Sequence, residues 1–208
     1  IFKAFFNIPI KGFCNKQQIV IENYVNSTAS NFWSKENKQR VFLTYCENFS
    51  KYLKGCVKNK QFTKVSSSEI LRVFPKNLKE CKFYFTLNRL LKQSETKKWP
   101  HVKCHGDFWL GNVLLDGGNC YLIDWEHSCE HVFFYDVMHF MLLQALKEQD
   151  FIFFNAYFKG DYDLYIGKLF ELADTDYFRH EKLLYLVICI AQRMVKFSDT
   201  TMAGYSRL

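Results

Sequence analysis

The sequence predicts an α+β fold in which helices dominate and a few short strands surround one polar motif. Apolar residues recur at helical spacing over most of the chain, whereas its beginning is extended in character. Short strands are expected at 101–104, 112–116 and 120–125. Gly117 and Gly118 are placed to form a hairpin turn between the last two strands.

The N-terminal segments are expected to be extended, with a helix following them. "FKAFFNIPIKGFC" is interrupted by Pro9 and Gly12, "QQIVIENYV" is rich in β-branched residues, and the polar linker "NSTAS" comes next. A helix with an apolar stripe is then expected from Ser34, and Gly55 is placed to end it.

Further helices are predicted on both sides of the polar motif. Ser66 and Glu69 have the spacing of a capping box, and Pro75 separates that helix from the next one. The register of the next helix consists of Leu78, Cys81, Phe85, Asn88 and Leu91. After the motif, helices are expected at 135–148, 151–158, 163–173 and about 177–197.

Composition narrows the class of protein. The chain has 208 residues, 49% of them hydrophobic, which is enough to bury one sizeable core, or one core with a small second lobe. Its net charge of +7 comes from scattered basic residues, which favours a solvated surface over nucleic-acid binding. The eight cysteines lack zinc-site spacing, so we expect reduced thiols in a cytoplasmic protein. The apolar run at 183–191 is too short to span a membrane.

The polar motif has the residue types that phosphoryl transfer needs. Asp107 and Asn112 stand in the order D-x-x-x-x-N, and Asp124 follows on the far side of the predicted hairpin. One carboxylate can accept the proton of an attacking hydroxyl, while an amide oxygen and a second carboxylate can hold Mg²⁺ against phosphates. Gly106 allows a tight turn beside the first acid.

The strings "HGDFWLGN" and "LIDWE" resemble the catalytic and metal-binding loops of the aminoglycoside phosphotransferase and choline kinase superfamily. The resemblance implies a protein-kinase-like fold with a mostly helical C-terminal lobe, a small β-hairpin catalytic region and a partial N-terminal lobe. It also implies that Asp107 is the catalytic base and His105 a loop-organising residue of the catalytic set. Asn112 and Asp124 would be the Mg²⁺ ligands, with ATP or GTP as the phosphoryl donor. "FFYDVMHF" is similar to a downstream element of the family, which makes Asp136 a structural brace for the loop.

The resemblance extends upstream more weakly. "NIPIKGFCNKQQIVIENYV" is similar to the last small-lobe strands of the family, which would place Glu22, Asn23 and Tyr24 beside the nucleotide base. A plain edge hairpin is the alternative. We therefore expect residues 1–26 to be a remnant of the small lobe and hinge, and residues 27–208 to form the large catalytic lobe. The Gly-rich turn and phosphate-pairing Lys of the family have no counterpart before residue 22.

The acceptor is expected to be a small hydroxylated molecule. Four residues are candidates to line its site, namely Trp109, Trp125, Glu126 and Glu130, and Tyr135 is a fifth. A basic chain argues against an aminoglycoside, an amino alcohol such as choline would need an aromatic cage, and a sugar is also compatible.

These observations predict an ATP-dependent small-molecule phosphotransferase that uses Mg²⁺, with a nucleotide and a small alcohol as its partners. The alternative is a non-catalytic, pseudokinase-like binding module or an inactive fragment. A nucleic-acid-binding protein depends on net charge alone and is the least favoured hypothesis. The oligomeric state is left open.

Overall fold

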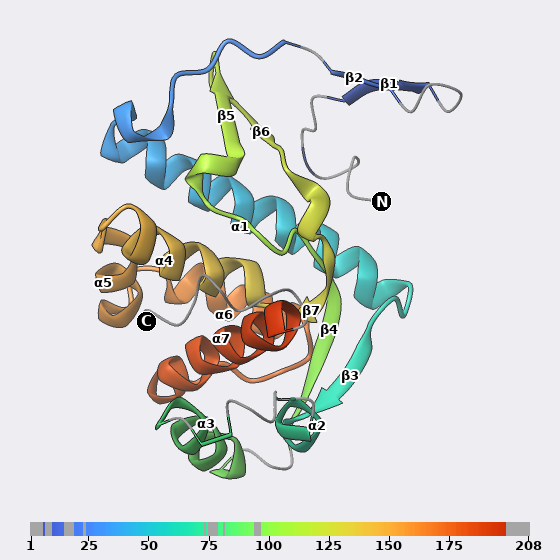
Figure 1. Cartoon of the computed structure of the whole chain (residues 1–208), viewed down its shortest axis with the longest axis vertical. Helices are drawn as coiled ribbons and strands as arrows, with labels where there is room; N and C mark the ends of the chain where they lie inside the picture. Colours follow the sequence, from blue (N-terminus) through green and yellow to red (C-terminus); the bar gives the residue numbers. More distant parts are fainter. Residues whose placement is uncertain are drawn as a thin grey trace.

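The computed structural model describes residues 6, 10–14, 19–22, 24–72, 74, 79–80, 82–93 and 97–198. It confirms a mainly helical α+β fold (Figure 1). The helices are α1 (Lys35–Lys58), α2 (Ser67–Arg72), α3 (Lys82–Gln93), α4 (Tyr135–Lys147), α5 (Ile152–Lys159), α6 (Asp163–Leu172) and α7 (Lys182–Ser198). The strands are β1 (Ile10–Cys14), β2 (Ile19–Glu22), β3 (Thr63–Ser66), β4 (Lys98–Cys104), β5 (Val113–Asp116), β6 (Asn119–Leu122) and β7 (Cys129–Val132).

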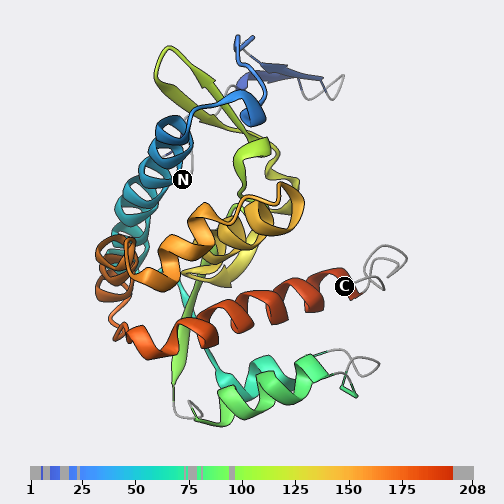
Figure 2. The ribbon, with the colours of Figure 1, turned by 90° about the vertical axis from the view of Figure 1, so that its left-hand side faces the viewer.

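Within the described residues, the strands form three small antiparallel sheets: β1-β2, β3-β4-β7 and β5-β6. The β1-β2 and β5-β6 hairpins lie at one end of the molecule, and α2 and α3 lie at the other end (Figure 2). Gly117 and Gly118 form the predicted turn of the β5-β6 hairpin with φ angles of 52° and 93°. This hairpin and the end of β4 carry the polar motif.

Aromatic side chains from distant parts of the sequence fill the core. Phe42 of α1 packs against Phe140 of α4 and Phe153 of α5, with ring centroids 5.0 and 5.6 Å away. All three side chains are almost completely buried. The long helix α1 is thereby attached to the C-terminal helices, and the polar motif lies between them. None of the helices in the described part of the chain is long and apolar enough to cross a membrane.

Two helix starts follow the predicted capping chemistry. The Ser34 side chain accepts a hydrogen bond from the backbone N–H of Asn37, three residues into α1. At α2, the Ser66 N–H donates to Glu69 Oε2 over 2.6 Å, and the Glu69 N–H donates back to Ser66 Oγ over 3.3 Å. The capping box predicted from Ser66 and Glu69 is therefore present.

Three details of the predicted helices are wrong. Gly55 lies inside α1, because Cys56 is buried in the core and its packing offsets the cost of a helical glycine, about 1 kcal/mol. A left-handed residue, which is common just after the end of a helix, occurs at Lys60, with φ 53°. In α3, the buried residues are Leu87 and Leu91, whereas Phe85 is 62% exposed.

The error at Phe85 has a geometric cause. Phe85 lies two residues before Leu87, about 200° around the helix, so it faces away from the buried side. Of the other residues predicted in this register, Asn88 is half-buried, while Leu78 and Cys81 lie outside the described residues. The last predicted helix also starts later than expected, at Lys182.

A buried ion pair fastens the beginning of α7. Lys182 Nζ lies 2.7 Å from Asp163 Oδ1 at the start of α6, and it donates to the Tyr157 carbonyl of α5 over 2.6 Å. The Tyr177 hydroxyl also donates to Asp163 Oδ1, over 2.7 Å. The Lys182 and Asp163 side chains are 6% and 9% exposed. These bonds connect α5, α6 and α7 at one point.

We expect Asp163→Asn to lower the free energy of unfolding by about 3 kcal/mol, because it leaves the Lys182 ammonium buried without its anion. Urea unfolding followed by circular dichroism measures this change. Glu171→Gln is the matched control, since Glu171 pairs with Lys168 on the exposed face of the same helix. The control should change stability by less than about 1 kcal/mol. Equal effects of the two variants would contradict the stabilising role of the buried pair.

Candidate active site

The predicted catalytic loop leaves the end of β4 in a tight turn. β4 ends at Cys104, and the next residues are His105, Gly106 and Asp107. Gly106 has φ 84°, a conformation that glycine adopts without strain. The loop then passes through a short 3₁₀ helix, η4 (Leu110–Asn112), into β5. Both Asp107 and Asn112 are buried, with 9% and 7% of their surface exposed.

The Asp136 side chain of α4 holds this turn by accepting hydrogen bonds from its backbone. Its Oδ2 accepts hydrogen bonds from the His105 N–H (2.7 Å) and the Tyr45 hydroxyl (2.5 Å), and its Oδ1 accepts one from the Gly106 N–H (2.9 Å). The Asp136 residue is only 1% exposed. Three donors compensate for the burial of this carboxylate. These contacts support the bracing role predicted for Asp136.

His105 links the catalytic loop to the segment that carries Asp124. Its Nε2 lies 2.8 Å from the Ile123 carbonyl, and its Nδ1 accepts the Asp107 N–H over 3.3 Å. The carbonyl requires the proton on Nε2, so a single neutral tautomer satisfies both contacts. Burial lowers the pKa of His105, which favours this neutral form. The His105 ring therefore connects the two loops. Its two hydrogen bonds are to backbone groups of Ile123 and Asp107, not to the Asp107 carboxylate oxygens.

The Asp107 carboxylate has partners on both oxygens. Asn112 Nδ2 donates to Oδ2 over 3.1 Å, while His139 Nε2 lies 3.0 Å from Oδ1 and Arg193 Nη1 lies 3.4 Å from it. Burial alone would raise the pKa of Asp107, but the bond from His139 and the charges of Arg193 and Lys147 hold it far below the usual carboxyl range. The carboxylate is therefore ionised at neutral pH and is a weaker base than an ordinary carboxylate.

His139 and Arg193 were not predicted from the sequence. His139 lies three residues after Asp136, which places the two side chains within one turn of α4, and this spacing was a signal that could have found it. Arg193 comes from α7, 86 residues after Asp107, and no local pattern points to it. The structure thus adds a basic pair to the predicted set.

Asn112 and Asp124 lie at the same end of the β5-β6 hairpin. The ladder ends with Val113 opposite Leu122, and the Ile123 N–H then donates to the Asn112 carbonyl over 3.0 Å. Asp124 follows directly in the left-handed conformation, with φ and ψ of 61°. The predicted Mg²⁺ ligands are therefore neighbours across the end of one hairpin.

The two side chains offer oxygens suited to Mg²⁺. Asn112 Nδ2 donates to the Asp107 carbonyl (2.8 Å) and to its carboxylate, which leaves Asn112 Oδ1 for a cation. The Asp124 carboxylate is exposed and has no hydrogen bond or ion pair within the described residues. No group of three or more His, Cys, Asp or Glu side chains that could hold a metal ion occurs there either. Two oxygen ligands with the remainder from water or phosphate fit Mg²⁺, which keeps several waters.

The candidate acceptor residues differ in their surroundings. Trp109 follows the catalytic loop, with Lys147 Nζ 4.2 Å from its ring centroid. The Trp125 ring packs against His105 at 4.6 Å, and its Nε1–H donates to the Leu122 carbonyl over 2.9 Å, so it supports the loop.

The two acidic candidates follow Trp125 and are exposed. Glu126 belongs to a short 3₁₀ helix, η5 (Trp125–His127), and its carboxylate lies 3.4 Å from His127 Nε2. Glu130 belongs to β7 and pairs with Lys103 of β4. The fifth candidate, Tyr135, is completely buried. It stacks on the His131 ring, with centroids 3.8 Å apart, so it serves as a core residue.

The predicted nucleotide-base segment is described only in part. Glu22 ends β2, Asn23 lies outside the described residues, and Tyr24 is 91% exposed. Just after them, Ser27 Oγ accepts a hydrogen bond from the Leu115 N–H of β5 over 2.9 Å. The segment that leads into α1 therefore touches the hairpin that carries Asn112.

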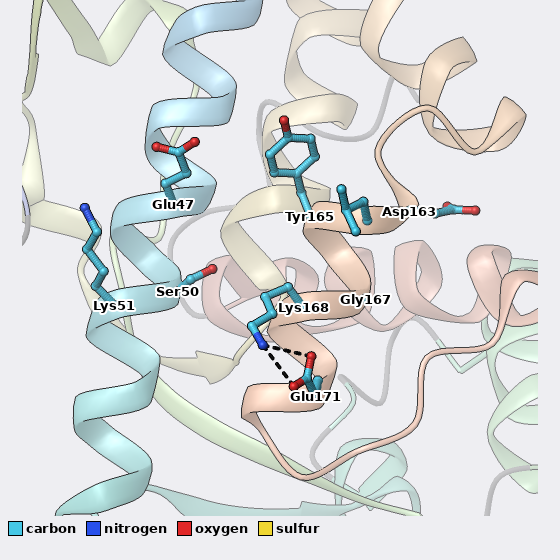
Figure 3. A pocket seen from close by; sticks show the side chains of 9 residues that line it. Glu47, Ser50, Lys51, Asp163, Tyr165, Gly167, Lys168 and Glu171 are labelled. Atoms are coloured by element: carbon cyan, nitrogen blue, oxygen red, sulfur yellow. Dashed lines mark hydrogen bonds and ion pairs between the residues drawn. The ribbon is translucent and has the colours of Figure 1, made fainter.

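Two cavities lie beside α1. One of about 180 Å³ is bounded by α1, the β5-β6 hairpin and Phe108 of the catalytic loop. The other, of about 570 Å³, lies between α1 and α6 (Figure 3). Glu47 and Lys51 of α1 line it opposite Lys168 and Glu171, and none of the predicted site residues takes part. The larger cavity is thus separate from the candidate active site.

Comparisons with known proteins find a partial match to one family model and similar folds among solved structures. Residues 67–169 match the family model of the phosphotransferase enzyme family. A choline/ethanolamine kinase family protein from Mesorhizobium loti is similar in structure, at 13% identity and a TM-score of 0.52, over 95% of this chain and 65% of that one. The amicoumacin kinase hAmiN, in complex with AMP-PNP, Ca²⁺ and Ami, is similar at 10% identity and a TM-score of 0.52, over 94% and 66%.

The chain thus spans just under two thirds of the length of these two proteins. A comparison with curated proteins found no match. The family match confirms the superfamily predicted from the motif residues, and the structural likeness confirms the fold.

We expect Asp124→Asn to remove the magnesium-dependent part of ATP binding, because it removes one anionic oxygen ligand and keeps a residue that tolerates the left-handed backbone. Isothermal titration with ATP, with and without Mg²⁺, measures the effect on the complete natural protein. Asp116→Asn is the matched control, as Asp116 is exposed at the opposite end of the same hairpin. Unchanged magnesium dependence in Asp124→Asn would show that the metal binds elsewhere.

Proposed function

Because residues 67–169 match the phosphotransferase enzyme family, we propose that the protein transfers the γ-phosphoryl group of ATP to a hydroxyl of a small molecule. The observation that carries this proposal is the Asp107 carboxylate, ionised and held on both oxygens, with Asn112 and Asp124 at the adjoining hairpin end. An ionised carboxylate beside two metal-competent oxygens is the arrangement that phosphoryl transfer to an alcohol requires.

In this proposal each residue has a separate task. Asp107 orients the acceptor hydroxyl and accepts its proton, and Asp136 and His105 keep the loop in place through their bonds. Asn112 Oδ1 and the Asp124 carboxylate would hold Mg²⁺, which neutralises charge on the phosphates when it is bound. The protein thus contributes mainly positioning and electrostatic stabilisation.

The proposed domain division keeps residues 1–26 as the small-lobe remnant and hinge and residues 27–208 as the catalytic lobe. The pairing of β1 with β2 and the Ser27–Leu115 bond support a hinge near Glu22 and Tyr24. GTP is an alternative donor, since hinge recognition through backbone groups has no side-chain signature. We place the protein in the cytoplasm, which agrees with six free cysteines among the described residues.

Among the predicted acceptors, the charges near Asp107 favour a sugar over choline. Arg193 and Lys147 are both cationic and both lower the pKa of Asp107. Lys147 also lies over the Trp109 ring, on which a quaternary ammonium would otherwise bind. A positively charged acceptor would be repelled by both side chains. An uncharged or anionic alcohol would not be.

We expect Asp107→Asn to lower kcat by about 100- to 10,000-fold, because the amide cannot accept the hydroxyl proton. ADP release is measured with ATP, Mg²⁺ and a panel of sugars, sugar phosphates, choline, ethanolamine and aminoglycosides, and ATP affinity should change little. Asp116→Asn is expected to keep full activity. Full turnover in Asp107→Asn would exclude Asp107 as the base, and ATP binding without transfer to any acceptor would favour the non-catalytic binding module.

We further expect kcat/KM for the best uncharged or anionic acceptor to exceed that for choline by at least tenfold, as electrostatic repulsion near the base predicts. Lys147→Met should narrow this ratio by about threefold to tenfold, since it exposes the Trp109 face to a cation. Lys159→Met is the control, because Lys159 is exposed at the end of α5. A preference for choline that is insensitive to Lys147 would contradict the assignment.

A further inference from the structure

Helix α7 reaches the catalytic region through several polar side chains. Gln192 Oε1 accepts the Val132 N–H of β7 over 3.1 Å, and its Nε2 lies 3.0 Å from His101 Nε2 on β4. His101 and Val132 are direct partners in the β4-β7 ladder, so one side chain of α7 contacts both strands. The ion pair of Lys182 fastens the other end of the helix. α7 is therefore held at a defined position relative to the loop that follows β4.

The next residue, Arg193, extends this contact to the predicted base. Its Nη1 lies 3.4 Å from Asp107 Oδ1 and 2.8 Å from His139 Nε2. The side chains of Arg193 and Asp107 are 18% and 12% exposed, and that of His139 is 1% exposed. Three ionisable groups from α4, α7 and the catalytic loop thus meet in a nearly buried cluster.

Either neutral tautomer of His139 leaves a donor directed at Asp107. With its proton on Nε2, the ring donates to Oδ1 over 3.0 Å, but this N–H then faces the Arg193 Nη1 donor 2.8 Å away, which disfavours this tautomer. With its proton on Nδ1, the ring accepts from Arg193 Nη1, and the guanidinium itself is the donor near Oδ1. The Oδ1 atom therefore keeps a donor in both cases.

The two oxygens of Asp107 are restrained from opposite sides. Asn112 donates to Oδ2, whereas Oδ1 accepts from Arg193, and also from His139 only when the His139 proton is on Nε2. One bond would let the carboxylate plane rotate about the bond to Cβ, but partners on both oxygens fix that plane. Oδ2, which has one donor, retains a lone pair for the acceptor hydroxyl.

We propose that Arg193 and His139 are positioning residues that fix the orientation of the Asp107 carboxylate toward the acceptor hydroxyl. This inference rests on the proposed phosphotransferase function. Phosphoryl transfer depends more on alignment of the attacking group than on strong general-base chemistry. A fixed orientation of the carboxylate therefore outweighs the basicity that it loses beside the Arg193 cation. α7 is then part of the catalytic apparatus as well as part of the core.

The test compares Arg193→Met, Arg193→Lys and the control Arg89→Met, which makes the same change on the exposed face of α3. In the complete natural protein, Arg193→Met should lower kcat by about 10- to 100-fold, while KM for ATP and for the acceptor changes less than about threefold. Arg193→Lys should recover part of kcat, because an ammonium replaces only part of the guanidinium geometry. Arg89→Met should match the wild type.

Two kinetic outcomes would overturn the proposal. A kcat within twofold of the wild type in both Arg193 variants would show that the orientation of Asp107 does not depend on Arg193. A raised acceptor KM with unchanged kcat would make Arg193 a ligand-binding residue instead. If Arg193→Met fails to fold, Arg193→Lys and His139→Gln decide the question by the same kcat criterion.

A second measurement separates this inference from the proposed function. The urea midpoints of Arg193→Met, Asp107→Asn and the double variant form a thermodynamic cycle that needs no activity. Non-additive midpoint shifts support the restraint of Asp107 by Arg193, even if the wild type transfers no phosphate and the proposed function fails. Additive shifts would overturn the restraint, even if the wild type is an active kinase.

Discussion

The buried carboxylate of Asp136 is the group on which the active-site geometry depends. A carboxylate that is 1% exposed is stable only if donors replace its lost water, and its donors here are two backbone N–H groups of the turn and one hydroxyl from α1. The turn, α1 and α4 therefore have one arrangement in which this charge is satisfied. Movement of any of the three would leave Asp136 unpaired in the core.

The remaining site residues are ordered outward from that turn. His105 connects the turn to Ile123 through a side-chain hydrogen bond. Ile123 in turn pairs with Asn112 at the end of the hairpin, and Asp124 follows it directly. Arg193 approaches from the other side on a helix that is fastened at its start by a buried ion pair. Four separate elements, namely the catalytic loop, the end of the hairpin, α4 and α7, thus meet at one carboxylate.

Local patterns predicted most of this site, and tertiary packing explains the rest. The order of Asp107, Asn112 and Asp124 around a Gly-Gly turn is a short-range property, so the motif and the hairpin were both accessible from sequence. Arg193 was not, because its place depends on how α7 packs against strands far away in the chain. Gly55 was misjudged for a similar reason: burial of the residue after it outweighs its weak helical propensity.

The hydrogen bond from the Leu115 N–H to Ser27 Oγ has a mechanical consequence. The Leu115 N–H belongs to β5, three residues after Asn112, and Ser27 lies on the segment that leads from β2 to α1. A rotation of the N-terminal strands about this segment must either break that bond or pull on the hairpin. Leu115 lies about 10 Å along the chain from Asn112 at the rise of a β-strand, so a displacement at Ser27 acts on the strand that begins next to a proposed metal ligand.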